Sequence, residues 1–204
     1  ELWLKMVNPK TNSILDEANR LFLTGKLREA ITYYDKILDE NPQHVSSLNN
    51  KGYALSKLKD FDNAIKCYDA ALETSPDDLS LLVNKISSFR KQEKFVDALS
   101  ICNRILDNNS KYNIALYHKE RILFSMENYD ESIECCNKIL NDYPDNADVL
   151  FDKSCSFVMM FKNKEALDLL ERAISQGTQY KIKAKKSKIF EKLSDNIRFK
   201  KLIL

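Results

Sequence analysis

Glycine and proline are scarce in this sequence, which has three glycines and four prolines among 204 residues. β-Hairpins and dinucleotide-binding loops use glycine more often than this, so the composition excludes most sheet-rich folds and favours helices. Apolar runs are short as well: none approaches the roughly 20 residues that a membrane-spanning helix needs, and no secretory signal opens the chain. We therefore expect an all-helical protein with no membrane partner.

Residues that carry catalytic chemistry are also few. His44 and His118 are the only imidazole groups, and paired metal ligands or a Cys–His nucleophile need side chains that converge. The sequence contains no phosphate-binding glycine loop and no G-x-S-x-G motif. These absences predict a protein that is not an enzyme, with no cofactor and no metal.

Five cysteines are present, an odd number with no C-x-x-C spacing. A disulfide framework or a zinc knuckle would have paired, closely spaced cysteines. A reducing compartment is the expected setting, and we predict a cytoplasmic localisation.

Charge is unevenly distributed along the chain. Hydrophobic residues make up 44% and charged residues 30%, which is typical of a folded protein. The net charge is +2, but residues 181–204 hold nine basic and two acidic side chains, or +7, which leaves −5 for the rest. Because nucleic-acid-binding proteins normally have a larger positive excess, nucleic acid is not the expected partner.

Sequence positions recur every 34 residues. Pro42 and Pro76 are separated by that interval, and Pro144 follows Pro76 by twice as much. A small-residue column has the same spacing: Ala30, Ala64, Ala98, Ser132 and Ala166. Four residues later comes a column of larger side chains: Tyr34, Tyr68, Cys102, Cys136 and Leu170. Agreement over five periods identifies a repeat protein.

These columns resemble the tetratricopeptide pattern, W-x-x-L-G-x-x-Y followed by A-x-x-x-F and P, over residues 11–180. The second unit matches best, at Leu48, Gly52, Leu55, Phe61, Ala64, Tyr68, Ala71 and Pro76. The glycine column departs from the pattern at Ile86 and Glu120, where we expect looser helix contacts. The resemblance implies an all-α, right-handed superhelical solenoid of about five helix-turn-helix repeats with a C-terminal capping helix.

The expected repeats are five units of equal length: residues 11–44, 45–78, 79–112, 113–146 and 147–180. Residues 1–10 are either an N-terminal extension or the end of a preceding repeat. Residues 181–204 are expected to form a basic capping helix and tail, with Ile182, Ile189, Phe190 and Leu193 in a stripe over the last hairpin. Within the tail, residues 196–204 are expected to form a short final helix that folds back with Ile197, Phe199 and Leu202.

In tetratricopeptide proteins the first helix of each repeat lines a concave groove that holds a peptide, so the resemblance implies such a groove here. By register its candidate residues are Asn19, Asn50, Tyr53, Asn84, Tyr117, His118, Arg121, Phe151 and Met159. Asn19 and Asn50 match two asparagines of the carboxylate clamp found in some members. The cationic positions of that clamp are not cationic here, so binding of a C-terminal carboxylate is not predicted.

Two features of this set allow alternatives. An asparagine amide both donates and accepts, and so suits a peptide backbone, but it could equally bond to a neighbouring helix or to water. The aromatic and apolar residues of the later repeats, Tyr117, Phe151 and Met159, indicate either a partner site or packing against the next unit.

A lysine column, made of Lys51, Lys85, Lys119 and Lys153, either rims the groove or is solvated with its stems packed. The predicted function is a non-enzymatic protein–protein interaction scaffold that holds a peptide or a partner segment. An RNA-binding helical repeat and a structural adaptor that self-associates through its ends are the alternatives.

Overall fold

The computed structural model describes residues 9–204, so most of the expected N-terminal segment 1–10 lies outside the described residues. Between residues 9 and 204 all regular secondary structure is helical, which confirms the fold class predicted from the sequence. Within the same residues, no helix has the length and apolar character needed to cross a membrane.

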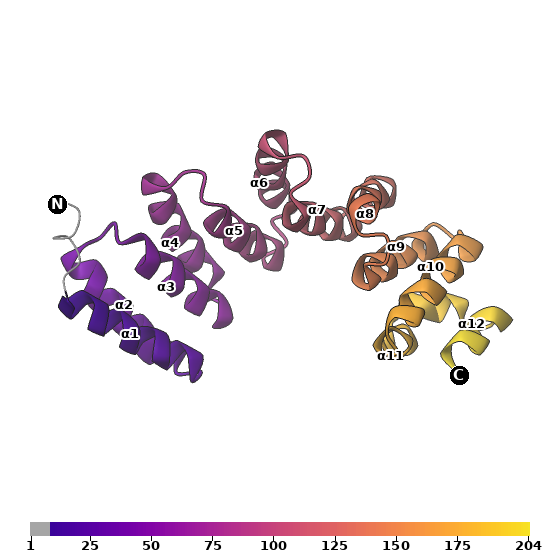
Figure 1. Ribbon diagram of the computed structural model, residues 1–204, viewed down its shortest axis with the longest axis horizontal. Helices are drawn as coiled ribbons and strands as arrows, with labels where there is room; N and C mark the ends of the chain where they lie inside the picture. Colours follow the sequence, from indigo (N-terminus) through magenta and orange to yellow (C-terminus); the bar gives the residue numbers. More distant parts are fainter. Residues whose placement is uncertain (1–8) are drawn as a thin grey trace. The chain divides into compact units, whose positions relative to one another are not determined.

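The first ten helices have similar lengths and are joined by short turns (Figure 1). Their bounds are α1 (Pro9–Leu23), α2 (Leu27–Glu40), α3 (Val45–Lys57), α4 (Phe61–Thr74), α5 (Leu79–Lys91), α6 (Phe95–Asn108), α7 (Asn113–Ser125), α8 (Tyr129–Asp142), α9 (Ala147–Met159) and α10 (Asn163–Gln176). Three shorter elements follow: α11 (Gln179–Lys186), the 3₁₀ helix η2 (Phe190–Leu193) and α12 (Ile197–Ile203).

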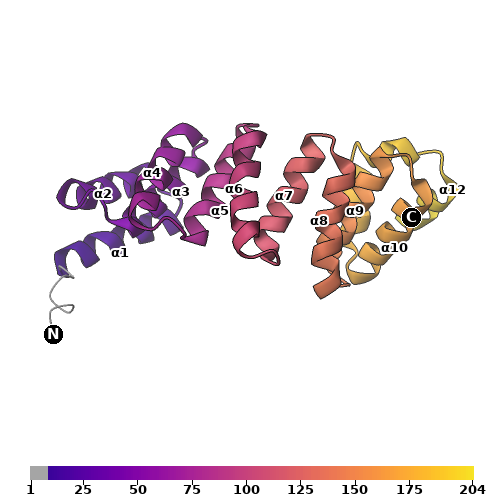
Figure 2. The same cartoon turned by 90° about the horizontal axis from the view of Figure 1, so that it is seen from above.

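The chain forms two compact units, Glu1–Ile101 and Cys102–Leu204, with the boundary inside α6. In the first unit, α1 packs on α2, α2 on α3, α3 on α4 and α4 on α5. The second unit repeats this arrangement from α7 to α10 (Figure 2). Each unit is therefore built from helical hairpins that pack against their neighbours in sequence order.

The repeated columns of the sequence form the core of these hairpins. All five members of the small-residue column are fully buried, and so are all five larger side chains that follow them. Small side chains let the two helices of a hairpin approach closely. Because the same positions recur in every repeat, the same kind of contact is made once per hairpin.

The turn inside each hairpin contains one residue with positive φ. Such residues occur 34 positions apart, at Gly25, Lys59, Glu93, Glu127 and Phe161, with φ between 59° and 79°. Glycine adopts this conformation without a steric penalty, whereas other residues do not. The sequence marks only the first of these turns by a glycine.

The two unusual residues of the glycine column are well packed, contrary to the looser contacts expected there. Ile86 and Glu120 are both buried. The Ser132 hydroxyl, which takes the place of an alanine in the small-residue column, donates to Glu120 Oε1 at 3.2 Å. A buried hydrogen bond therefore joins the two helices of this hairpin, and another, from Ser154 Oγ to the Ala166 carbonyl at 2.7 Å, joins α9 to α10.

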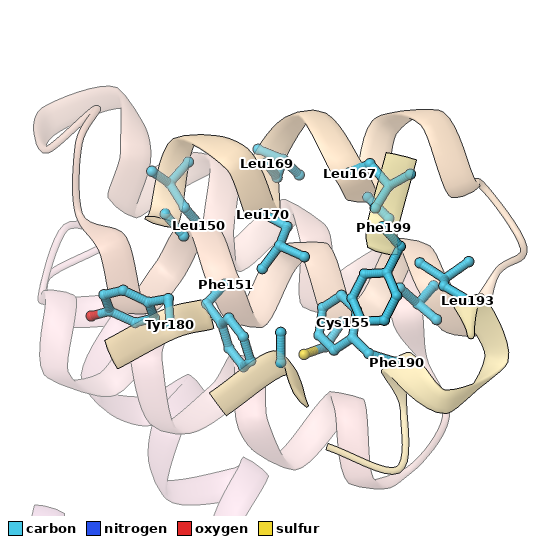
Figure 3. Close-up of a cluster of buried hydrophobic side chains, with 14 residues drawn as sticks. Leu150, Phe151, Cys155, Leu167, Leu169, Leu170, Tyr180, Phe190, Leu193 and Phe199 are labelled. Atoms are coloured by element: carbon cyan, nitrogen blue, oxygen red, sulfur yellow. The ribbon is translucent and has the colours of Figure 1, made fainter. Parts of the chain in front are cut away.

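In the C-terminal segment, the short final helix expected over residues 196–204 is present as α12, but the capping part over residues 181–195 is not a single helix. Helix α11 ends at Lys186, and the chain folds back through η2 and α12. Phe190 and Leu193 are buried as predicted, but Ile182 faces solvent, and Tyr180 and Ala184 of α11 are buried in its place. Figure 3 shows Tyr180, Phe190 and Phe199 entering the same apolar cluster as Leu170 of α10.

Candidate functional site

A hollow of about 240 Å³ opens on the first unit, between α1, α2 and α3. Its lining consists of Asn19, Phe22, Leu23, Tyr34, Asn50 and Tyr53. Three of these, Asn19, Asn50 and Tyr53, are groove residues predicted from the sequence, and the structure brings them together. We call this feature the α1–α3 hollow.

The polar part of the α1–α3 hollow is a hydrogen-bonded group from three helices. The Tyr34 hydroxyl donates to Asn19 Oδ1 at 2.8 Å, and Asn50 Nδ2 donates to the same oxygen at 3.0 Å. Burial raises the pKa of the Tyr34 phenol, so it remains a donor at neutral pH. The amide nitrogen of Asn19 and the carbonyl oxygen of Asn50 are not used in these two bonds, and together they offer one donor and one acceptor.

The apolar part of the hollow is partly exposed. Leu23 has 83% of its surface exposed and Tyr53 has 41%. The rings of Phe22 and Tyr53 are tilted against each other with their centroids 5.5 Å apart. Lys57 Nζ lies 5.3 Å from the centre of the Tyr53 ring, where a cation is attracted by the ring's electrons.

The remaining predicted asparagine belongs to a second amide pair in the same unit. Asn84 Nδ2 on α5 donates to Asn49 Oδ1 on α3 at 2.9 Å. Asn84 does not line the α1–α3 hollow. Of the two interpretations of the asparagines, bonding to a neighbouring helix describes Asn19, Asn50 and Asn84 in this structure.

In the second unit, Tyr117 and Arg121 form a stacked pair on α7, where His118 is also half-buried. The Arg121 guanidinium lies 4.4 Å from the centre of the Tyr117 ring, and its Nη2 is 3.3 Å from Asp152 Oδ2 on α9. Burial raises the pKa of Asp152, while the guanidinium lowers it, and burial has the larger effect. Arg121 and Asp152 are therefore a partly buried pair that connects α7 to α9.

Phe151 and Met159 do not form an open apolar surface, which was one of the two interpretations that the sequence allowed. Phe151 is only 9% exposed, because Tyr180 of α11 and Phe190 of η2 pack against it with ring centroids 5.8 and 5.5 Å away (Figure 3). The Lys192 ammonium reaches the sulfur of Met159 at 3.4 Å. The alternative, packing against the element that follows, therefore holds for Phe151, because the C-terminal segment folds back over α9.

The lysine column joins consecutive hairpins. In the first unit Lys51 pairs with Asp35 and Lys85 with Asp69. The equivalent bonds of the second unit run from Lys119 to Asn103 and from Lys153 to Asn137. Each lysine thus bonds to the residue sixteen positions earlier. Because these ammonium groups already have protein partners, the column adds no support to RNA binding.

All five thiols are buried. Burial raises the pKa of Cys102 to about 12 and that of Cys135 to about 11, so neither is a thiolate at neutral pH. Among the described residues, no three His, Cys, Asp or Glu side chains are grouped so that they could hold a metal ion.

Register also places Phe22 on the groove side of the first repeat, but the other two residues of the α1–α3 hollow were missed by sequence reasoning. Tyr34 belongs to a column assigned to the core, and its hydroxyl nevertheless reaches the base of the hollow. Leu23 ends α1 immediately before the turn at Gly25. An apolar residue beside a turn glycine was the only available signal for Leu23, and it is a weak one.

Repeated helical hairpins with buried small-residue contacts define a class of helical repeat proteins, and sequence comparison identifies the family. Residues 5–133 match the family model described as the tetratricopeptide repeat protein 21 N-terminal ARM repeat. The match covers more than half of the chain, and the chain belongs to the tetratricopeptide repeat family. No curated protein sequence matches the chain.

Solved structures share the fold at low sequence identity. A tetratricopeptide repeat protein from Parabacteroides merdae ATCC 43184 superimposes with a TM-score of 0.83 at 17% identity, covering 96% of this chain and 78% of that one. MamA from Desulfovibrio magneticus RS-1 has a TM-score of 0.75 at 18% identity, with coverage of 82% and 95%. YrrB, described as a TPR protein with an unusual peptide-binding site, has a TM-score of 0.67 at 20% identity, with coverage of 85% and 91%.

Proposed function

We propose that this protein is a non-enzymatic interaction scaffold and that the α1–α3 hollow holds a segment of a partner protein. The observation that carries the proposal is the composition of the hollow, in which exposed apolar side chains surround a small group of oriented amides. Ligand sites of proteins commonly combine an apolar lining with a few placed polar groups. YrrB is a structural neighbour described as having a peptide-binding site, which is consistent with this assignment.

The chemistry of the hollow suits one bulky apolar side chain on an extended peptide. Phe22, Leu23 and Tyr53 supply the apolar contacts, and partly exposed aromatic side chains are typical anchors of binding energy. The donor of Asn19 and the acceptor of Asn50 can bond the carbonyl and the amide of the peptide backbone. We expect selection for an apolar residue at one peptide position and little selection at its neighbours.

Selection of random peptides displayed on phage against the full chain tests this proposal. Peptides that share an apolar residue should be enriched, and their affinity should fall by about ten-fold or more with Tyr53→Ala, because that substitution removes one wall of the hollow. Tyr143→Ala is the matched control, since Tyr143 is also an exposed aromatic residue but lies in the second unit. Peptides that bind Tyr53→Ala as tightly as the native chain would contradict the assignment.

The five buried, unpaired cysteines support a reducing compartment such as the cytoplasm as the place of action. In that setting the thiols stay reduced and serve as small core residues. The partner is accordingly expected among proteins of the same compartment.

A further inference from the structure

A five-residue pattern occurs twice in the C-terminal segment. Residues 182–186 of α11 read Ile-Lys-Ala-Lys-Lys, and residues 197–201 of α12 read Ile-Arg-Phe-Lys-Lys. Both copies have an isoleucine, a cation, an apolar residue and two lysines in the same order. The two helices that carry them pack against each other.

The second and third positions of each copy attach the helix to the rest of the unit. Lys183 Nζ lies 3.0 Å from Asp148 Oδ1 on α9. Arg198 reaches two carboxylates of α10, those of Asp168 and Glu171, each at 2.6 Å. The residue that follows each of these cations, Ala184 or Phe199, is buried in the apolar cluster of this unit.

The first, fourth and fifth positions face solvent in both copies. Ile182 is 54% exposed and Ile197 is 72% exposed. The lysines at the other two positions are exposed as well: Lys185, Lys186, Lys200 and Lys201. Residues at spacings of three and four share one face of a helix, so each helix presents one aliphatic side chain beside two ammonium groups. We call these six residues the twin Ile-Lys-Lys surface.

We propose that the twin Ile-Lys-Lys surface binds an anionic lipid bilayer. Charge complementarity supports this occupant, because residues 181–204 carry +7 and still leave +4 once the three carboxylates that pair with Lys183 and Arg198, those of Asp148, Asp168 and Glu171, are counted. Each lysine near an anionic leaflet contributes about a five-fold gain in affinity. An exposed ion pair with a peptide often contributes no measurable gain, so four exposed lysines favour the bilayer over an acidic peptide.

The two isoleucines favour the same occupant. Ile182 and Ile197 are both exposed, and neither belongs to the lining of the α1–α3 hollow. A projecting aliphatic group between cations can enter the boundary between lipid headgroups and acyl chains while the lysines stay at the headgroups. The sequence predicted no membrane partner because it lacks an apolar run long enough to span, and a contact of this kind does not need one.

Flotation of the full chain with vesicles tests the proposal. We expect binding to vesicles of about 70% phosphatidylcholine and about 30% phosphatidylserine at low salt, no binding to phosphatidylcholine alone, and release as salt rises. The quadruple variant Lys185→Gln, Lys186→Gln, Lys200→Gln, Lys201→Gln should bind at least about 100-fold more weakly. The double variant Ile182→Ser, Ile197→Ser should lose several-fold while keeping all charges.

A matched control replaces four exposed lysines of the first unit and so changes the net charge equally: Lys26→Gln, Lys36→Gln, Lys59→Gln and Lys66→Gln. This variant should float like the native chain. Equal binding by both quadruple variants would overturn the proposal. A bound fraction that does not change with Ile182→Ser and Ile197→Ser, together with equally tight binding of single-stranded RNA, would also overturn it in favour of a general polyanion site.

Discussion

Gly52 lies directly against the ring of Tyr68, so that a Cβ atom added to Gly52 would come within 2.6 Å of Tyr68 Cε1. Both residues belong to the second hairpin, which pairs α3 with α4. Tyr68 is fully buried, and its ring cannot move aside without displacing its neighbours. The glycine is therefore required by packing at this position.

We expect Gly52→Ala to destabilise the protein by about 1–2 kcal/mol. Overpacking a core costs about 1–3 kcal/mol, and the better helix propensity of alanine offsets up to about 1 kcal/mol of this. Urea unfolding followed by circular dichroism measures the change. Ser80→Ala on the exposed surface of α5 is the control and should not destabilise. If Gly52→Ala unfolds at the same urea concentration as the native protein, the Tyr68 ring can move aside without cost.

The positive-φ turns lead to a second prediction. Introducing glycine at this turn position should stabilise the protein, and removing glycine from the equivalent position should destabilise it. Lys59→Gly and Glu93→Gly should each stabilise the protein by about 0.5–1 kcal/mol, because a non-glycine residue in this conformation costs about 1–2 kcal/mol and the greater unfolded-chain entropy of glycine offsets part of the gain. Gly25→Ala should destabilise by about 1 kcal/mol for the same reason. Thermal unfolding of the three variants provides the comparison.

The control for these turn variants is Lys57→Gly, two residues before Lys59 and the last residue of α3. Glycine in a helix costs about 1 kcal/mol relative to alanine, so this variant should be destabilised. If Lys59→Gly and Lys57→Gly change stability in the same direction, the strain attributed to the turns is absent.

The buried thiols predict a loss of stability at alkaline pH. The pKa values of Cys102 and Cys135 in the folded protein, about 12 and about 11, are higher than the value of about 8.5 for an unfolded chain. The contribution of these two thiols to the free energy of unfolding is fully present below about pH 8.5. It is lost as the pH rises towards their pKa values in the folded protein, because the unfolded state then releases protons that the folded state keeps. We expect roughly 1–2 kcal/mol per thiol to be lost between about pH 8.5 and pH 10.

Urea midpoints measured from about pH 7 to about pH 10 test this effect. The double variant Cys102→Ala, Cys135→Ala should start from a lower stability and fall less steeply with pH. Alkylation by iodoacetamide at about pH 8 should be slow for the folded native chain and rapid in urea. Parallel pH profiles for the two proteins would exclude Cys102 and Cys135 as the cause.

The lysine bonds between hairpins give a fourth prediction, because the first unit uses aspartate where the second uses asparagine. Asn103→Asp should convert the bond of Lys119 into an ion pair and stabilise the protein by about 0.2–1 kcal/mol. Asp69→Asn should have the opposite effect on the bond of Lys85. The stability changes caused by both substitutions should be smaller in about 1 M salt, where exposed charges are screened.

The control for the lysine bonds is the same Asn103→Asp substitution made in a Lys119→Gln background. It adds the same negative charge at the same place on α6 but leaves it without the ammonium group that Asn103 now contacts. The difference between the two backgrounds isolates the energy of the pair. An equal gain in both backgrounds would mean that net charge, and not the specific pair, is responsible.

Much of the fold could be predicted from single columns of residues. Ala64 belongs to the small-residue column and Tyr68 to the column of larger side chains. Members of both columns are buried in every repeat, because each hairpin packs its two helices through the same positions. Their spacing alone predicted helices, hairpins and core. The positive-φ turns at Glu93 and Glu127 left no comparable signal, because the surrounding hairpin holds an ordinary residue in that conformation.

The candidate site was predicted only in part. Asn19, Asn50 and Tyr53 lie together as expected, since the repeat places equivalent positions of α1 and α3 side by side. For Phe151 the sequence left two interpretations open, a partner site or packing against the next element, and the structure shows the second, because Phe190 of the C-terminal segment packs on its ring. The apolar stripe of the C-terminal segment predicted a cover over the last hairpin, but it did not specify which groove residues that cover buries.

The sequence by itself determined the repeated hairpin, because a 34-residue period of small and large apolar side chains is buried only when equivalent helices pair in the same way. Only the tertiary structure decided which surfaces stay exposed. Exposure depends on contacts between residues that do not occupy equivalent positions of the 34-residue repeat. The fold of the C-terminal segment closes the apolar face of α9 and turns Ile182 and Ile197 outward. In the first unit, the α1–α3 hollow stays accessible beside the exposed Leu23.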